Sequence, residues 1–389
     1  MIIIIGAGIS GLYLGYLLQK QGKDFIILEQ EKRYGGRVYV EWFEKERVVL
    51  GAGIGRFEKD KILYDLCTSL HVPVHKYTSQ ISRVFSNERI KKFMDELKGL
   101  KKIRLTREKR STTDFLTFLE ENKQPDFMTL SGYTDYIHAD IIDTIQDYGF
   151  DDVISGYTGF SIDWDDLLDK LYNSISDNVH LGEGVIDQKN KRVRTNKGVY
   201  YYDQLVCTVP VSIARTIFPS IKILDDLEGQ PFSRIYVKID KGKKEMSEKI
   251  KNFTIVDSYL QKIIPINPDK GIYMIGYNDN FDALESFVEF TTMTEKEVYD
   301  KLSHEIKRIF GIDITISLSK IAFWDYGTTY YKPLKTEYKD RGEWLKIAQN
   351  PVSDIYFVGE GFSRNQGWVE GALESVDTIY KNALIKMLS

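Results

Sequence analysis

The sequence predicts an α/β protein in which a dinucleotide-binding domain is assembled from separated segments around an inserted α+β domain. The first indication is a strand, a glycine turn, a helix and a second strand within the first 29 residues. The second is another apolar strand that runs into glycines close to the other end of the chain, at 354–371. The third is the length of 389 residues, which is more than one ordinary hydrophobic core supports.

The N-terminal segment has the order of elements of a phosphate-binding unit. Residues 2–5 form a continuous apolar run, typical of a central parallel strand, and GAGISG follows at once. Gly6 permits a tight turn, Gly8 lets a pyrophosphate approach the backbone, and Gly11 lets the helix pack closely on the strand. Ser10 lies in the first turn of that helix, whose N-terminus favours phosphate charge.

The second strand, FIILE at 25–29, ends in an acid about 20 residues after the turn. Glu29 is therefore positioned to accept hydrogen bonds from the ribose of an adenosine group. A glycine pattern alone is weak evidence, but here both strands, the helix and the acid occur in the correct order. The segment predicts a Rossmann-like dinucleotide-binding domain.

The next residues, 31–37, extend this site with two glycines and two arginines. A second close backbone approach at Gly36 and a guanidinium at Arg37 suit the pyrophosphate and ribityl portion of FAD. The alternative interpretation is a loop with a solvated charge cluster.

Five motifs occur in the order found in a known family: GAGISG, LE at 28–29, GGR at 35–37, LGAG at 50–53, and VGEG followed by GWVEGALES near the C-terminal end. In these motifs the chain resembles the flavin-dependent amine oxidases, which include monoamine, polyamine and L-amino-acid oxidases. The resemblance extends from residue 2 to about 376, and the middle matches in pattern only. It implies non-covalent FAD, because the segment that holds a tethering cysteine in some members reads Gly327-Thr328-Thr329 here.

The resemblance also implies the residues that contact the cofactor. The Val369 N–H, at the start of a helix, would face the flavin pyrimidine edge, and Val185 would contact adenine through its backbone. A helix N-terminus suits the negative charge that a reduced flavin holds. The implied cofactor-binding residues are Gly6, Gly8, Ser10, Gly11, Glu29, Gly36, Arg37, Ala52, Gly53, Val185, Gly359, Glu360, Trp368 and Val369.

Two aromatic residues flank the substrate in the resembling family. One falls at Trp368, and the other falls in FWDYGTTYYKP, where Tyr330 or Tyr331 is the expected partner and Tyr326 a weaker candidate. A lysine that holds a water near the flavin falls on the strand PFSRIYVKID, where the register leaves Arg234 or Lys238. A guanidinium stays charged and is a poorer proton shuttle than an amine.

The motif positions divide the chain into two discontinuous domains. We expect residues 1–75, 179–229 and 345–389 to form the FAD-binding domain and residues 76–178 and 230–344 to form the substrate-binding domain. The first inserted segment looks mainly helical, and the second reads as strands followed by a helix.

Composition argues against several classes of function. The formal net charge of −4 gives no reason to expect nucleic-acid binding, and the apolar N-terminal run is too short for a membrane span. We expect a soluble, cytoplasmic protein, monomeric or homodimeric. The two cysteines and five histidines show no metal-ligand spacing, so no metal is expected. Residues 76–110 are basic, and residues 135–169 are rich in Asp. One interpretation is that both segments form solvated faces; the other is that the Asp-rich segment attracts a cationic amine.

The expected activity is oxidation of a small-molecule amine to an imine, with oxygen as electron acceptor and hydrogen peroxide as product. Alternatives are a flavin-dependent desaturase, a sugar-nucleotide mutase, or a flavin-binding interaction protein without catalysis. An amino-acid substrate would need an inward arginine for its carboxylate, and Arg83, Arg89 and Arg234 are candidates.

Overall fold

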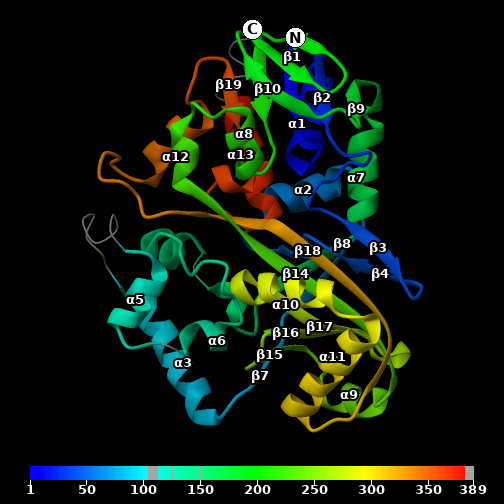
Figure 1. The fold of residues 1–389 in the computed structure, drawn as a ribbon. Helices are drawn as coiled ribbons and strands as arrows, with labels where there is room; N and C mark the ends of the chain where they lie inside the picture. The colour runs from blue at the N-terminus through cyan, green and yellow to red at the C-terminus, as the bar shows by residue number, and fades with distance from the viewer. Residues whose placement is uncertain (104–112, 125, 149, 382–389) are drawn as a thin grey trace.

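The computed structural model describes residues 1–103, 113–124, 126–148 and 150–381. In Figure 1 the chain forms an upper lobe, which contains the N-terminus, and a lower lobe, and two long strands pass from one lobe to the other. Within these ranges no helix combines the length and apolarity needed to cross a bilayer.

A five-stranded parallel sheet forms the centre of the upper lobe, in the order β19, β13, β1, β2, β9. Its strands are β1 (Ile2–Ile5), β2 (Phe25–Glu29), β9 (Val179–Leu181), β13 (Gln204–Cys207) and β19 (Ile355–Phe357). In β1, Ile2 and Ile4 belong to one hydrophobic core, and Ile3 and Ile5 belong to another. This alternation explains the continuous apolar run, because the strand is covered on both faces.

Helices cover both faces of this sheet, which confirms the predicted α/β class. One face packs against α1 (Ile9–Lys20), α2 (Lys61–Ser69), α7 (Trp164–Asn173) and α13 (Val369–Ile379). The other face packs against α8 (Val211–Ile217) and α12 (Arg341–Gln349). A small antiparallel sheet of β10 (Val185–Lys189), β11 (Arg192–Thr195) and β12 (Val199–Tyr201) lies beside it, as Figure 1 shows near β10.

The hydrophobic contacts place α7 in the upper lobe, although the sequence assigned residues 76–178 to the inserted domain. Trp164, Leu167, Leu168 and Leu171 are buried in the same core as β1 and α1. Their spacing puts all four on one helical face. The upper lobe therefore includes a helix from before residue 179, because α7 leads through a short turn at 176–178 into β9 at the edge of the sheet.

The lower lobe is built on a six-stranded mixed sheet in the order β18, β14, β17, β16, β15, β7. Its strands are β7 (Ile81–Val84), β14 (Leu227–Lys241), β15 (Phe253–Val256), β16 (Lys262–Asn267), β17 (Ile272–Asp279) and β18 (Thr315–Tyr331). Helices α9 (Lys243–Lys249), α10 (Asn280–Thr292) and α11 (Glu295–Phe310) pack on one face of it. The strands β14 and β18 are 15 and 17 residues long, and they are the two strands that cross between the lobes in Figure 1.

The remaining elements are the helical part of the insert and two small sheets, whose strands come in part from residues 40–56, before the insert. Helices α3 (Asn87–Leu100), α5 (Phe115–Glu121) and α6 (Phe127–Ser131) and a π-helical turn, η1 (Asp143–Tyr148), surround a core that includes Phe115, Phe127 and Phe150. The small sheets are β3 (Val40–Phe43) with β4 (Glu46–Val49), and β5 (Gly55–Arg56) and β6 (Val74–Thr78) on either side of β8 (Thr158–Ile162). Short 3-10 turns are η2 (Asp151–Val153), η3 (Ser176–Asn178), η4 (Lys222–Asp226), η5 (Pro268–Lys270) and η6 (Glu360–Phe362).

Candidate cofactor and substrate site

One cavity of about 860 Å³ extends from the glycine turn of the upper lobe to the sheet of the lower lobe. Its volume lies in the upper part of the range usual for ligand sites. The predicted residues that line it are Gly6, Gly8, Ser10, Glu29, Gly36, Arg37, Ala52, Gly53, Val185, Arg234, Gly359, Glu360, Trp368 and Val369. The cavity therefore brings together segments from both ends and the middle of the chain.

The glycines of the first turn have distinct structural tasks. A Cβ on Gly11 would lie 2.0 Å from the Gly6 carbonyl oxygen, so only glycine lets α1 start this close to the strand. Gly11 thus shapes the turn without lining the cavity. A Cβ on Gly8 would meet no protein atom within 4 Å, and Gly8 lines the cavity. Gly8 is also the N-cap of α1 and supplies no side-chain cap, so the free N–H groups of the first helical turn face this space.

Glu29 ties the end of β2 to the glycine turn. Its Oε2 accepts a hydrogen bond from the Ala7 N–H at 2.7 Å, and its Oε1 accepts one from the Glu31 N–H at 2.9 Å. Each carboxylate oxygen keeps a second lone pair that can accept a hydroxyl. The side chain is held in one orientation while it lines the cavity.

Arg37 and Glu360 form an ion pair across the cavity wall, with Nη1 and Oε1 2.8 Å apart. Glu360 is buried, and it also accepts hydrogen bonds from the Thr329 hydroxyl at 2.6 Å and the Gly367 N–H at 3.0 Å. Arg37 donates a further bond to the Gly327 carbonyl at 3.0 Å. Glu360 therefore organises the loop before α13, and a direct contact of Glu360 with cofactor hydroxyls stays a prediction.

The start of α13 is an uncapped helix N-terminus that faces the cavity. Trp368 is its N-cap residue and gives no side-chain cap, and Val369 lines the cavity. Glu370, the acid of the first turn, points elsewhere: it accepts hydrogen bonds from the N–H groups of Ile62 and Leu63 at 3.0 and 2.9 Å, at the start of α2. A Cβ on Gly371 would lie 2.2 Å from the Asn365 carbonyl, which explains the glycine in this turn.

The indole of Trp368 is held by a buried cation. The Arg56 guanidinium carbon lies 3.9 Å from the Trp368 ring centroid, and Arg56 is paired with the buried Asp60 at 2.7 Å. This cation–π contact fixes the ring at the cavity wall.

Of the two candidates on β14, the structure places only Arg234 at the cavity. Arg234 is buried, donates to the Val49 carbonyl at 2.7 Å, and lies against Gly53, where a Cβ would come within 3.3 Å of its Nη2. Lys238 pairs with Glu44 at 2.5 Å at the other end of the strand. Four residues of strand correspond to about 13 Å, which is too far for both to reach one point.

The tyrosines of β18 line different cavities, depending on their position along the strand. Tyr326 lines the large cavity, whereas Tyr330 and Tyr331 do not and instead border a separate cavity of about 50 Å³. The Tyr331 hydroxyl donates to the Ser363 carbonyl, and its ring packs in the upper-lobe core. Trp368 lines the large cavity with Tyr326 and also borders the small cavity with Tyr330 and Tyr331. Of the three tyrosines only Tyr326 reaches the large cavity, because β18 leaves it before residue 330, and which of them flanks a substrate stays a prediction.

The lower-lobe end of the cavity contains residues that the sequence did not single out. They are aromatic and acidic: Tyr133, Asp135, Tyr148, Asp152, Tyr157 and Tyr277. Most lie in or next to the Asp-rich segment 135–169, which indicated a charged region without identifying inward residues. The sequence did contain one indication that Asp135 points inward. It lies in Tyr133-Thr134-Asp135-Tyr136, between aromatic residues, which are often largely buried.

Asp135 is the most unusual of these groups. It lines both cavities, and its Oδ1 is buried without a hydrogen-bond partner among the described residues. Burial, reinforced by the charge of Asp279, raises the pKa of Asp135 to about 8. Asp152 is also buried, accepts a hydrogen bond from the Tyr148 hydroxyl at 3.3 Å, and has a pKa raised by burial. With a pKa of about 8, Asp135 exchanges its proton near neutral pH, and its charged form attracts cations.

Comparisons with known proteins agree with the fold described above. A family model described as "NAD(P)-binding Rossmann-like domain" matches residues 4–97. An uncharacterized protein, R188, of Acanthamoeba polyphaga mimivirus is 32% identical over 85 residues, which are 20% of this chain and 16% of that protein. The match thus spans about a sixth of that relative's length.

Solved structures match the whole chain. Three variants from a structure-based redesign of cofactor binding in putrescine oxidase, a single, a triple and a double mutant, have TM-scores of 0.79, 0.77 and 0.75. The alignments cover 98–99% of this chain and 98% of each of theirs, at 12–13% identity. Identity this low supports the fold and not the reaction. The chain therefore contains an NAD(P)-binding Rossmann-like domain and has, along its length, the amine oxidase fold of putrescine oxidase.

Proposed function

We propose that the protein is an FAD-dependent amine oxidoreductase. The observation that carries this proposal is the single cavity that joins the glycine turn and Glu29 to Trp368, Arg234 and Tyr326. A dinucleotide bound at the turn would reach the uncapped start of α13, and a small substrate would fit between that point and the lower-lobe sheet. The chain shares its fold with putrescine oxidase, and the residues of the cavity within that fold are what favour the same reaction class.

The residues of the cavity fit FAD. The open space over Gly8 and the uncapped N-terminus of α1 suit a pyrophosphate, and Glu29 suits a ribose. Neither cysteine lines the cavity, since Cys67 and Cys207 are both buried in the hydrophobic cores, so the proposed cofactor has no bond to cysteine, in keeping with the non-covalent binding we propose.

When bound, FAD supplies the two-electron acceptor: the amine loses a hydride equivalent and a proton to become an imine, water hydrolyses the imine, and oxygen takes up the electrons as hydrogen peroxide. The chain supplies binding and electrostatics. The free N–H groups at the start of α13 would stabilise negative charge beside Val369. Trp368 and Tyr326 would form the apolar walls that orient the amine, and the charged form of Asp135 would attract it.

Of the two positions on β14 that the resemblance leaves open for the family's lysine, Arg234 is the one that lines the cavity. A guanidinium does not deprotonate, so Arg234 would hold a water or the substrate by hydrogen bonds and would not shuttle a proton. Its Nε is buried without a partner among the described residues.

Purification followed by anaerobic mixing tests the proposal. The protein should be yellow, should release FAD on denaturation, and should lose its flavin absorbance near neutral pH when a suitable amine is added. The panel should contain 1,4-diaminobutane, benzylamine and L-amino acids, with 1,4-butanediol as an uncharged control. A protein that cannot be loaded with FAD, or a flavin that no amine reduces, would overturn the proposal.

A further inference from the structure

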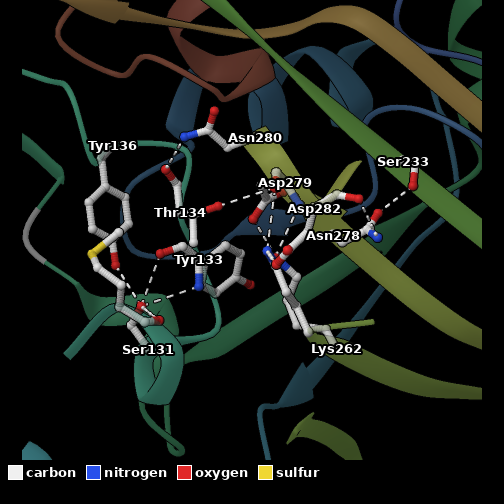
Figure 2. Close-up of polar contacts among 12 residues, drawn as sticks. Ser131, Tyr133, Thr134, Tyr136, Ser233, Lys262, Asn278, Asp279, Asn280 and Asp282 are labelled. Carbon is white, nitrogen blue, oxygen red and sulfur yellow. Dashed lines mark hydrogen bonds and ion pairs between the residues drawn. The ribbon is translucent and has the colours of Figure 1, made fainter. Parts of the chain in front are cut away.

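Lys262, at the start of β16, is a charged residue with no exposed surface. Its Nζ lies 2.6 Å from Asp279 Oδ2 and 3.4 Å from Gln261 Oε1, and Gln261 in turn accepts a hydrogen bond from the Asp279 N–H at 3.1 Å. Figure 2 shows the lysine side chain pointing at Asp279 among the polar groups of β17 and the loop after α6. Asp279 is buried as well, so the pair is enclosed by protein.

The same ammonium group also contacts two aromatic rings. Nζ lies 4.2 Å from the ring centroid of Tyr133 and 4.2 Å from that of Tyr277. The two rings come from different parts of the chain, the loop after α6 and strand β17, and they are nearly perpendicular with centroids 6.4 Å apart. One buried cation therefore links two elements through their rings.

Both of these rings line the large cavity, whereas Lys262 itself does not. Tyr277 has a second cation near its ring, because the Arg234 guanidinium carbon lies 4.7 Å from the centroid. Tyr133 is two residues from Asp135. The lysine thus lies behind the cavity wall and contacts two of the rings that form it, Tyr133 and Tyr277.

Stability alone does not explain a buried pair of this kind. Taking two charges out of water is costly, and replacing a buried ion pair with apolar groups is often neutral or stabilising. We infer that Lys262 is a positioning residue that holds Tyr133 and Tyr277 in place and so fixes the width of the substrate end of the cavity. The inference rests on the proposed function only in taking that end of the cavity as the substrate site.

The test uses the purified full-length chain and a probe that no amine oxidase chemistry consumes. Benzyltrimethylammonium carries a cation and an aromatic ring, and its quaternary nitrogen has no lone pair with which to form an imine. Binding is measured by titration calorimetry for the unaltered protein and for a variant with both Lys262→Met and Asp279→Asn. This double variant keeps the local net charge at zero and removes together the opposite effects of Asp279, which raises the pKa of Asp135, and of Lys262, which lowers it, so a change in affinity reports the position of the rings.

The expected result is a roughly tenfold weaker binding of the probe by the double variant, with a melting temperature close to that of the unaltered protein. The matched control is Lys301→Met with Glu289→Gln: this lysine also has an acid partner and lies 5.2 Å from the Tyr259 ring, but it does not line or border the cavity. The control should bind the probe as the unaltered protein does.

If the double variant does not fold, Lys262→Arg, which keeps the cation, should keep probe affinity within about threefold, while Lys262→Gln should not. Equal binding by the unaltered protein and the neutral-pair variant, or no binding by the unaltered protein, would overturn the inference. Failure of every amine to reduce the flavin, with the Lys262 effect on probe binding intact, would instead overturn only the proposed function.

Discussion

At the scale of single residues, two glycines of the first turn have different roles. Gly11 is required by the fold, whereas Gly8 leaves space for the proposed cofactor. A Cβ at Gly8 would meet no protein atom within 4 Å, and its φ of −70° suits any residue. Gly8→Val should therefore leave the free energy of unfolding within about 0.5 kcal/mol of the unaltered value. The added methyl groups would occupy the space proposed for the pyrophosphate, so FAD retention should fall at least tenfold.

The measurement is bound FAD per protein after gel filtration, together with urea unfolding of the apoprotein. Gly99→Val is the matched control, because its Cβ is equally free and lies outside the cavity, in α3. Gly11→Ala, in contrast to Gly8→Val, should lower the free energy of unfolding, since its Cβ would collide with the Gly6 carbonyl oxygen. Full FAD retention by Gly8→Val would contradict the proposed phosphate site.

The buried Asp135 makes stability depend on pH. Its pKa is raised from 3.8 to about 8 by burial and by Asp279, so between these values the folded state holds a proton that the unfolded state has lost. Stability contributed by this group therefore falls as pH rises from about 4 to about 8, by at most about 1.4 kcal/mol per pH unit. Asp135→Asn should remove this slope.

Urea unfolding at pH 5, 6.5 and 8 checks the Asp135 prediction. The unaltered protein should lose stability relative to Asp135→Asn as pH increases, whereas the exposed Asp240→Asn should follow the unaltered protein throughout. If the difference in the free energy of unfolding between the unaltered protein and Asp135→Asn stays constant from pH 5 to pH 8, Asp135 keeps its charge in the folded state.

At the scale of elements, the sequence predicted what is encoded locally. The order strand, glycine turn, helix, strand and acid lies within 29 residues, and each step has a direct physical requirement, so β1, α1 and β2 were found with Glu29 at the strand end. The uncapped start of α13 was found in the same way, from Gly367, Trp368 and Gly371.

Position along a long strand could not be predicted. Alternation tells which face a side chain takes, but not where a cavity lies along 17 residues, so Tyr326 could not be preferred to Tyr330 or Tyr331. β-bulges in β14 also shift the register with β18, which blurs such assignments further. Lys262 was missed because its role depends on rings that lie 129 and 15 residues away in the chain.

Helices α2 and α13 are joined by hydrogen bonds to Glu370. Glu370 caps the N-terminus of α2 with both carboxylate oxygens, and this draws the acid away from the start of its own helix. Glu370→Ala should lower the free energy of unfolding by about 1–2 kcal/mol and weaken FAD retention, because α13 loses its anchor.

Chemical unfolding and FAD retention, measured side by side, test the role of Glu370. Asp114→Ala is the matched control: Asp114 caps α5 by accepting the Thr117 N–H at 2.8 Å, in the inserted lobe. Its loss should cost similar stability with no change in FAD retention. Equal loss of FAD in both variants would mean that retention follows stability alone.

At the scale of the whole molecule, the cavity draws its walls from both lobes, and β14 and β18 run through both. The two strands pair with each other over most of their length, so one lobe cannot unfold without breaking that ladder in the other. We expect a single unfolding transition in calorimetry. Since FAD would bind only the folded chain, adding it at 100 times its dissociation constant should raise the free energy of unfolding by about 2.7 kcal/mol. Two resolved transitions, of which FAD moves only one, would show instead that the lobes unfold separately and that the cofactor is held by the upper lobe alone.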